Sequence, residues 1–189
     1  MRYLLLLALA LAMTVPGIAS LPPLDRDESR FVQASRQMLE SGDFVDIRFQ
    51  EESRYKKPVG IYWLQAAAVK AADGIGVRNA HTRIAVYRIP SLLGAIGGVL
   101  VTYWAALAFV SRRGAVLAAL MMAASVLLGV EARLAKTDAV LLMCITAAMG
   151  AMAHAYTRHW KEGALAERGW LLPAVFWTAL AAGVLIKGP

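Results

Sequence analysis

The chain has 189 residues, of which 59% are hydrophobic and 17% charged, and its formal net charge is +7. A soluble domain of this length usually carries about 25% charged residues. Here the apolar residues gather in runs of about 17–25, which is long enough to cross a bilayer as a helix. These values exclude an ordinary soluble protein. The basic residues alternate with acids in the loops, which favours membrane lipids over nucleic acid as partners.

The first predicted element covers residues 1–20, where Arg2 precedes an apolar run from Tyr3 to Ser20. Two interpretations remain open. One is a signal peptide that is cleaved near Ala19. The other is a first transmembrane span that is retained, and we favour it because the run is long for a signal peptide and further spans follow.

A polar segment follows at residues 21–87, and it contains two predicted helices. Apolar and small residues recur at helical spacing from Phe31 to Leu39, which indicates an amphipathic helix that Gly42 ends. A second helix is expected after Pro58. Its aromatic residues are typical of a helix at the membrane interface, where aromatic rings favour the headgroup level.

Residues 88–189 hold four further predicted spans. One runs from Ile89 to Val110. The apolar stretch from Ala115 to Tyr156 is twice the length of a span and is interrupted once, at Glu131–Asp138, which indicates a hairpin of two spans. The last runs from Trp170 to Ile186. The predicted fold class is therefore an all-α, polytopic transmembrane protein with about five spans.

The lysine and arginine content of the short loops predicts the orientation. The loops on one side carry more of these residues than the loop on the other side, which holds Arg133 and Lys136. The richer loops, expected inside, contain Arg112, Arg113, Arg158, Lys161 and Arg168. Residues 21–87 are then extracytoplasmic. In a Gram-negative bacterium this places the loop in the periplasm and the protein in the inner membrane.

Several acids of the outer side have two interpretations. Asp25 could cap the first outer helix and form a capping box with Glu28. Asp27 would then lie in the first turn, where the helix dipole stabilises an acid. Alternatively, these acids share a functional site with charges at other span ends, because charge at membrane depth is costly and usually pairs or lines a cavity. Likewise, Lys136 and Asp138 could form a salt-bridged turn.

The basic stretch Tyr55-Lys56-Lys57-Pro58 also has two interpretations. It is either a solvated turn before the second outer helix or a phosphate clamp, since lysine is a compact point charge that suits phosphate. Lys187-Gly188 could simply end the last helix. The sequence contains neither an H-E-x-x-H motif nor a cysteine metal cluster. No cofactor is therefore expected; a divalent metal stays open as an alternative but has no support in the sequence.

The order of these motifs resembles the first outer loop of membrane glycosyltransferases of the GT-C fold. The similarity is to the lipid A aminoarabinose transferases and the protein O-mannosyltransferase superfamily. The motifs of this loop, in order, are Asp27-Glu28-x-Arg30-Phe31, Ser35-Arg36-Gln37-Met38-Leu39 and Tyr55-x-Lys57-Pro58-x-x-x-Tyr62-Trp63. Two later marks of the family follow, Asp138 at the outer start of the fourth span and Lys187-Gly188 after the fifth.

The resemblance implies a polyprenyl-phosphate sugar as donor, a lipid or protein acceptor, and transfer with inversion on the outer membrane face. It implies that Asp27 is the general base, with Glu28 as a supporting acid and Asp25 as the fallback base. It also assigns phosphate contacts or a positioning role to the other matched polar residues, namely Arg30, Tyr55, Lys57, Asp138 and Lys187.

Two departures from the family pattern bear on this expectation. Some aminoarabinose transferases carry an acid where this chain has Lys56, so a metal contact by that acid is not expected here. Family members also continue through many more spans, and we expect the chain to be the N-terminal part of a longer protein. The alternative function is a transporter or membrane scaffold, in which the outer charges guide a solute or a partner.

Overall fold

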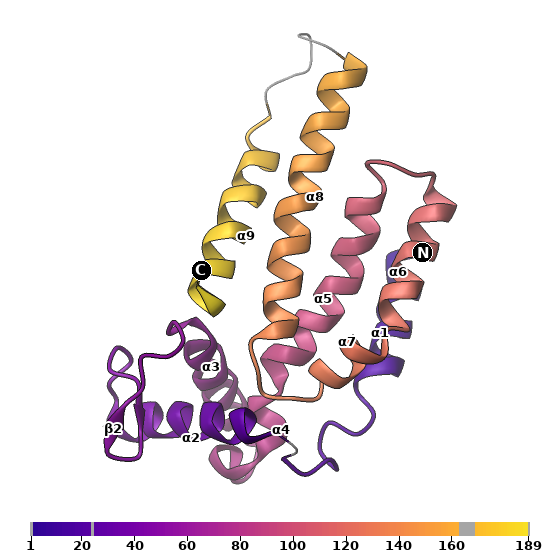
Figure 1. Ribbon diagram of the computed structural model, residues 1–189. Coiled ribbons are helices and arrows are strands. Elements are labelled where there is room, and N and C mark those ends of the chain that lie inside the picture. The colour runs from indigo at the N-terminus through magenta and orange to yellow at the C-terminus, as the bar shows by residue number, and fades with distance from the viewer. Residues whose placement is uncertain (1, 24, 163–168, 189) are drawn as a thin grey trace.

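The computed structural model describes residues 2–23, 25–162 and 169–188, with only the backbone for residues 159–162. It is almost entirely helical (Figure 1). The long helices are α1 (Arg2–Thr14), α2 (Arg26–Ser41), α3 (Gly60–Gly74), α5 (Ile89–Ala106), α6 (Arg112–Ala123), α8 (Asp138–Glu162) and α9 (Leu171–Lys187). The short elements are β1 (Arg48–Phe49), β2 (Glu52–Ser53), the 3₁₀ turn η1 (Ala80–Thr82), α4 (Ile84–Tyr87) and α7 (Val126–Glu131).

Helices α1, α5, α6, α8 and α9 form a bundle, and α2, α3 and the β1–β2 hairpin gather at one end of it (Figure 1). The closest packing within the bundle joins α5 to α8. At Gly94 of α5 a Cβ atom would lie 2.7 Å from the backbone nitrogen of Val140, so only glycine fits there. Such small residues let transmembrane helices approach closely.

Each of the five predicted spans corresponds to one or two helices of the bundle, namely α1, α5, α6 with α7, α8 and α9, but several of these helices are shorter than the predicted spans. Within the described residues, two stretches are long and apolar enough to cross a membrane, Ile84–Ala106 and Asp138–Arg158. Helix α1 ends at Thr14 rather than Ser20, because Pro16 follows and Gly17 adopts φ +89°. The third predicted span is divided into α6 and α7, with Ser125 as the N-cap of α7.

The outer segment contains both predicted helices. Gly42 ends α2 with φ 72°, a left-handed conformation that favours glycine. Helix α3 buries Ile61, Val69 and the polar Gln65, whereas the apolar Leu64 is 40% exposed. The amide of Gln65 explains this burial, because it accepts from the Ser35 hydroxyl at 2.6 Å and donates to the Ala135 carbonyl at 3.2 Å.

Helix α3 also begins directly against the end of α9. A Cβ atom at Gly60 would lie 2.6 Å from the carbonyl oxygen of Leu185, so the two backbones meet at this point. The contact brings the segment before α3, which carries Lys56 and Lys57, beside Lys187 at the end of α9. Residues 130 positions apart in sequence are thereby joined in one surface.

Candidate functional site

A cavity of about 480 Å³ lies between the segment before α3 and the end of α9. Three lysines line it, Lys56, Lys57 and Lys187, together with the exposed ring of Tyr55. The remaining lining residues are Ile47, Pro58, Val59 and Gly188. The structure thus brings together three of the predicted site residues, Tyr55, Lys57 and Lys187.

Two of the three lysines that line this cavity have no acidic partner within the described part of the chain. Among the described residues, Lys56 and Lys57 make no ion pair, whereas Lys187 pairs with Asp138. Tyr55 is held by its hydroxyl, which donates to Asp46 Oδ1 at 2.6 Å. Two unpaired ammonium groups beside a third are suited to bind a phosphate, which accepts charge-assisted hydrogen bonds from several cations.

A second group of charges lies next to this cavity, where α2, α8 and α9 meet. The predicted salt bridge between Lys136 and Asp138 is wrong. Lys136 instead pairs with Asp25 at 2.7 Å, and Asp138 pairs with Lys187. Lys136 and Asp138 do not pair because their side chains point to different helices. Asp138 starts α8 and faces the end of α9, whereas Lys136 faces the start of α2. These two pairs connect the outer helices to the bundle.

Hydrogen bonds and charge shift the pKa values in this group. The hydrogen bond from Lys136 holds the pKa of Asp25 below its usual value, helped by the Asp27 backbone N–H. The same bond raises the pKa of Lys136. Asp25 accepts from the Asp27 backbone at 2.9 Å and is the N-cap of α2, as predicted. These contacts favour a structural role for Asp25.

Glu131, at the end of α7, differs from the other acids of this group. Its Oε2 is buried and has no hydrogen-bond partner among the described residues. Burial raises its pKa, and the charges of Lys136 and Asp138 act on it in opposite directions. A buried acceptor without a donor is costly. Sequence reasoning placed Glu131 on the outer face but gave it no role.

Asp27, the predicted base, lies in the first turn of α2 and points outward, with 52% of its side chain exposed. Its Oδ1 is 3.4 Å from Nη1 of Arg30, one turn later, which is a long and weak contact. The carboxylate is therefore accessible and only loosely held. Asp27 and Arg30 lie next to each other on α2, and their roles in the site stay predictions.

Glu28, the predicted supporting acid, is fully buried and fully bonded. Arg88 binds it with two groups, Nε to Oε1 at 2.7 Å and Nη2 to Oε2 at 3.2 Å, and the Ala135 backbone N–H donates to Oε1 at 2.9 Å. The predicted capping box is wrong, because this carboxylate faces Arg88 and not the helix N-cap. These contacts favour a structural role, and a catalytic role for Glu28 stays a prediction.

Arg88 is the residue that sequence reasoning missed most clearly. It is fully buried, and beyond Glu28 its Nη1 donates to the carbonyls of Ile18 and Leu21, both at 2.8 Å. It therefore ties the linker after α1 to α2 and to the start of α5. An arginine directly before a predicted span was a usable signal, since a buried charge needs a partner.

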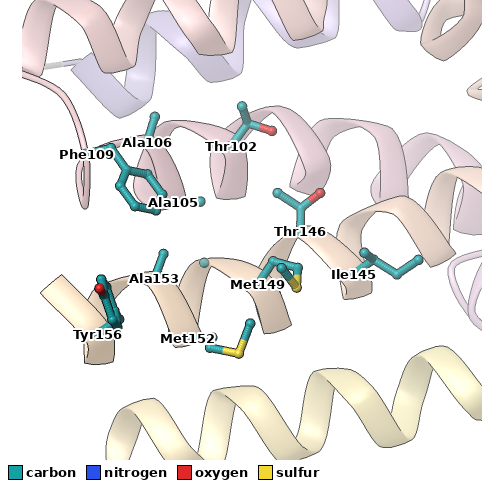
Figure 2. Close-up of a pocket in the computed structure, with 11 residues that line it drawn as sticks. Thr102, Ala105, Ala106, Phe109, Ile145, Thr146, Met149, Met152, Ala153 and Tyr156 are labelled. Atoms are coloured by element: carbon teal, nitrogen blue, oxygen red, sulfur yellow. The ribbon is translucent and has the colours of Figure 1, made fainter.

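A larger cavity lies elsewhere, between α5 and α8 (Figure 2). It measures about 620 Å³, and its lining is apolar apart from hydroxyl groups such as Thr102 and Thr146. It lies beside the C-terminal end of α5 and the middle of α8. It holds no charged side chain and offers no acid–base chemistry.

Enzymes that act on phosphates often use divalent cations. Across the described parts of the chain, no three His, Cys, Asp or Glu side chains lie close enough to hold a metal ion. The expectation that this site uses no metal or other cofactor stays a prediction.

Comparison with known proteins places the chain in a family. Residues 4–189 match the model of the family described as dolichyl-phosphate-mannose-protein mannosyltransferase. The chain belongs to this family. The match covers both the outer segment that carries the lysines and the helices that present Asp138 and Lys187.

Individual relatives agree with this assignment. An uncharacterized protein of Aquifex aeolicus (strain VF5) is 29% identical over 86% of this chain and 30% of its own length. The undecaprenyl phosphate-alpha-4-amino-4-deoxy-L-arabinose arabinosyl transferase of Pectobacterium carotovorum subsp. carotovorum (strain PC1) is 28% identical over 65% of this chain and 21% of its own length.

Solved structures show the same fold. The crystal structures of ArnT from Cupriavidus metallidurans, in the apo state and bound to undecaprenyl phosphate, each superpose with a TM-score of 0.80 at 24% identity. Each match covers 98% of this chain and 32% of that one. The fold is therefore that of a polytopic membrane protein of the GT-C type, as predicted. The chain spans about a third or less of the length of these relatives.

Proposed function

We propose that this chain forms the donor-phosphate end of a membrane glycosyltransferase, which moves a sugar from a polyprenyl phosphate to a lipid or protein acceptor. The observation that carries the proposal is the convergence of Lys56, Lys57 and Lys187 on one cavity. The relatives support it, because the family description and the Pectobacterium transferase both name a polyprenyl-phosphate sugar. The sugar of this protein is a pentose or a hexose in this proposal.

The resemblance to the family implies the following reaction, and the groups present are compatible with it. The acceptor hydroxyl attacks the anomeric carbon, and the bond from that carbon to the phosphate oxygen breaks, with inversion of configuration. The acceptor proton passes to the exposed Asp27 carboxylate, which acts as the general base. The phosphate leaves on its lipid with an added negative charge, and Lys57 and Lys187 stabilise that charge.

The surroundings of the site fit a location at a membrane surface. The lysine cavity, Asp27 and the outer helices all lie at the same end of the bundle, close to the ends of the spans (Figure 1). We propose that this end faces the periplasm of a bacterial inner membrane. The transporter alternative predicts charges at mid-membrane depth, whereas the described charge clusters lie at the outer end.

Paired lysine variants test the proposal. In the complete protein, Lys57→Ala should raise the KM for the polyprenyl-phosphate sugar about 10-fold or more, because the cation that binds the phosphate is lost. Lys56→Ala, which removes a neighbouring charge of the same cavity, should have a smaller effect because only Lys57 occupies the Lys-Pro position. A donor titration measures both. Small and equal effects would assign the stretch to a solvated turn.

A further inference from the structure

Two fully buried tyrosines of the outer segment differ in one respect. Tyr62 in α3 and Tyr87 in α4 are both 0% exposed. The Tyr87 hydroxyl donates to the His81 carbonyl at 2.9 Å. The Tyr62 hydroxyl has no hydrogen-bond partner among the described residues. An unpaired buried hydroxyl is costly, so such a group calls for an explanation.

The ring of Tyr62 is held firmly in place. It packs against Phe31 of α2, with 5.5 Å between the ring centroids, and it belongs to the same apolar cluster as Ile61 and Ile186. The hydroxyl therefore cannot turn away to find water. A hydrogen bond to this hydroxyl therefore requires another side chain to move towards it.

Two charged groups lie near this hydroxyl. Burial raises the pKa of Tyr62, and the Asp27 carboxylate adds to that effect. The Arg54 guanidinium approaches the phenolic oxygen as a donor and lowers the pKa through this contact and its charge, but the contact falls short of a hydrogen bond of normal geometry. Arg54 Nε is itself buried and, like the hydroxyl, lacks a hydrogen-bonded partner among the described residues. The three groups form an incomplete chain, since Arg54 can only donate, Asp27 can only accept, and a tyrosine hydroxyl can do both.

Asp27 has the freedom to complete this chain. Its side chain is half exposed, and its 3.4 Å contact with Arg30 is too long to hold it strongly. Asp27 lies one helical turn before Phe31, whose ring packs on Tyr62, so its carboxylate is on the face of α2 from which it can turn from Arg30 towards α3. Catalytic hydrogen bonds are often loose in the free enzyme and shorten only when substrate is bound.

We propose that Tyr62 is a positioning residue for Asp27: its hydroxyl donates to the Asp27 carboxylate in the substrate-loaded enzyme, while Arg54 donates to the tyrosine oxygen. This inference rests on the proposed function of Asp27 as the base. The chain fixes the carboxylate where the acceptor hydroxyl must lose its proton. No bond to substrate is assigned to Tyr62 or Arg54.

The test compares Tyr62→Phe with Tyr87→Phe, which removes a hydroxyl that is bonded in the free protein. Thermal unfolding of the substrate-free complete protein in detergent gives the first measurement. Tyr62→Phe should keep or raise the midpoint, because an unpaired polar atom is removed, whereas Tyr87→Phe should lower it. If Tyr62→Phe lowered the thermal midpoint as much as Tyr87→Phe, the inference would be overturned, since the Tyr62 hydroxyl would then already be hydrogen-bonded in the substrate-free protein.

Sugar transfer gives the second measurement. Tyr62→Phe should lower kcat about 10- to 100-fold with little change in KM, because orientation of the base is lost.

The outcomes separate this inference from the proposed function. A wild-type protein that transfers sugar, with an unchanged kcat in Tyr62→Phe, would overturn the role of Tyr62 and leave the proposed function standing. A wild-type protein without any transfer would overturn both, because there would be no base for Tyr62 to position. The expected fall in kcat with the matched Tyr87→Phe near wild type would support the inference.

Discussion

Three acids within four positions of the chain have three different environments. Asp25 caps α2 and pairs with Lys136, Glu28 is enclosed by Arg88, and Asp27 between them remains exposed. Helical geometry explains the difference, since successive residues of α2 point to different sides. Asp27 is thus the only one of these three that can take a proton from a bound acceptor without breaking a structural contact.

Glu131 gives a prediction at the same scale. Its carboxyl pKa is raised by burial, so its ionised form is less stable in the folded than in the unfolded protein. This destabilisation is absent at low pH and develops as the pH rises above the ordinary carboxyl value towards the folded one. Glu131→Gln should therefore raise the thermal midpoint near pH 7. The gain in the free energy of unfolding should be at most about 1 kcal/mol, because the group is partly exposed.

Unfolding curves of Glu131→Gln and wild type at several pH values provide the measurement. The advantage of the variant should shrink near pH 4, where the wild-type carboxyl is largely protonated in both states. Asp138→Asn is the matched control, because it removes an acid that is paired with Lys187 and should lower stability instead. A Glu131→Gln variant less stable than wild type at pH 7 would show that Oε2 already has a partner.

At the scale of the elements, the sequence predicted the segments better than their contacts. The ends of α2 at Asp25 and Gly42 and the start of α3 after Pro58 follow from capping and breaker residues, which act locally. The partners of Glu28, Lys136 and Asp138 could not be predicted, because each is set by how distant helices pack. The burial of Gln65 is likewise set by distant segments, since its partners are Ser35 and Ala135.

The buried pair of Glu28 and Arg88 fixes how α2 docks on the bundle, and it gives the next prediction. Glu28→Gln leaves the Arg88 charge buried without a counterion, which should cost about 3–5 kcal/mol. Membrane abundance and the thermal midpoint should both fall. The double variant Glu28→Gln with Arg88→Gln should lose less than the sum of the two single variants.

A catalytic role for Glu28 leads to a different result. If Glu28 acts in the chemistry and not in docking, Glu28→Gln would keep wild-type abundance and midpoint but abolish sugar transfer. Quantifying the protein in the membrane before the transfer assay distinguishes the two cases. A stable but inactive variant would contradict the structural role that the contacts with Arg88 favour.

The whole molecule has two chemically different ends. One end carries the lysine cavity, the ion pairs and the outer helices, and the other carries the short basic connection between α5 and α6 (Figure 1). Lys161 and Arg168, which also support the predicted orientation, lie outside the side chains that the structure describes. The orientation therefore stays a prediction, with the site on the outer side.

Cysteine labelling tests this orientation. Val45 is 80% exposed in the outer segment, and Arg113 lies at the exposed start of α6, so both positions accept a cysteine. The native Cys144 is buried and should react little. In intact spheroplasts an impermeant reagent should label Val45→Cys and not Arg113→Cys until the membrane is opened. The opposite pattern would place the lysine cavity in the cytoplasm.

The most direct test of the account is sugar transfer by Asp27→Asn in the complete protein. The change keeps the shape of the side chain but removes the proton acceptor, so turnover should fall by roughly 10²–10⁴ while membrane abundance is unchanged. Asp25→Asn is the control, since it should lower stability by breaking the pair with Lys136 and reduce transfer less. Transfer by Asp27→Asn at the wild-type rate would contradict the assignment of the base and, with it, the proposed site.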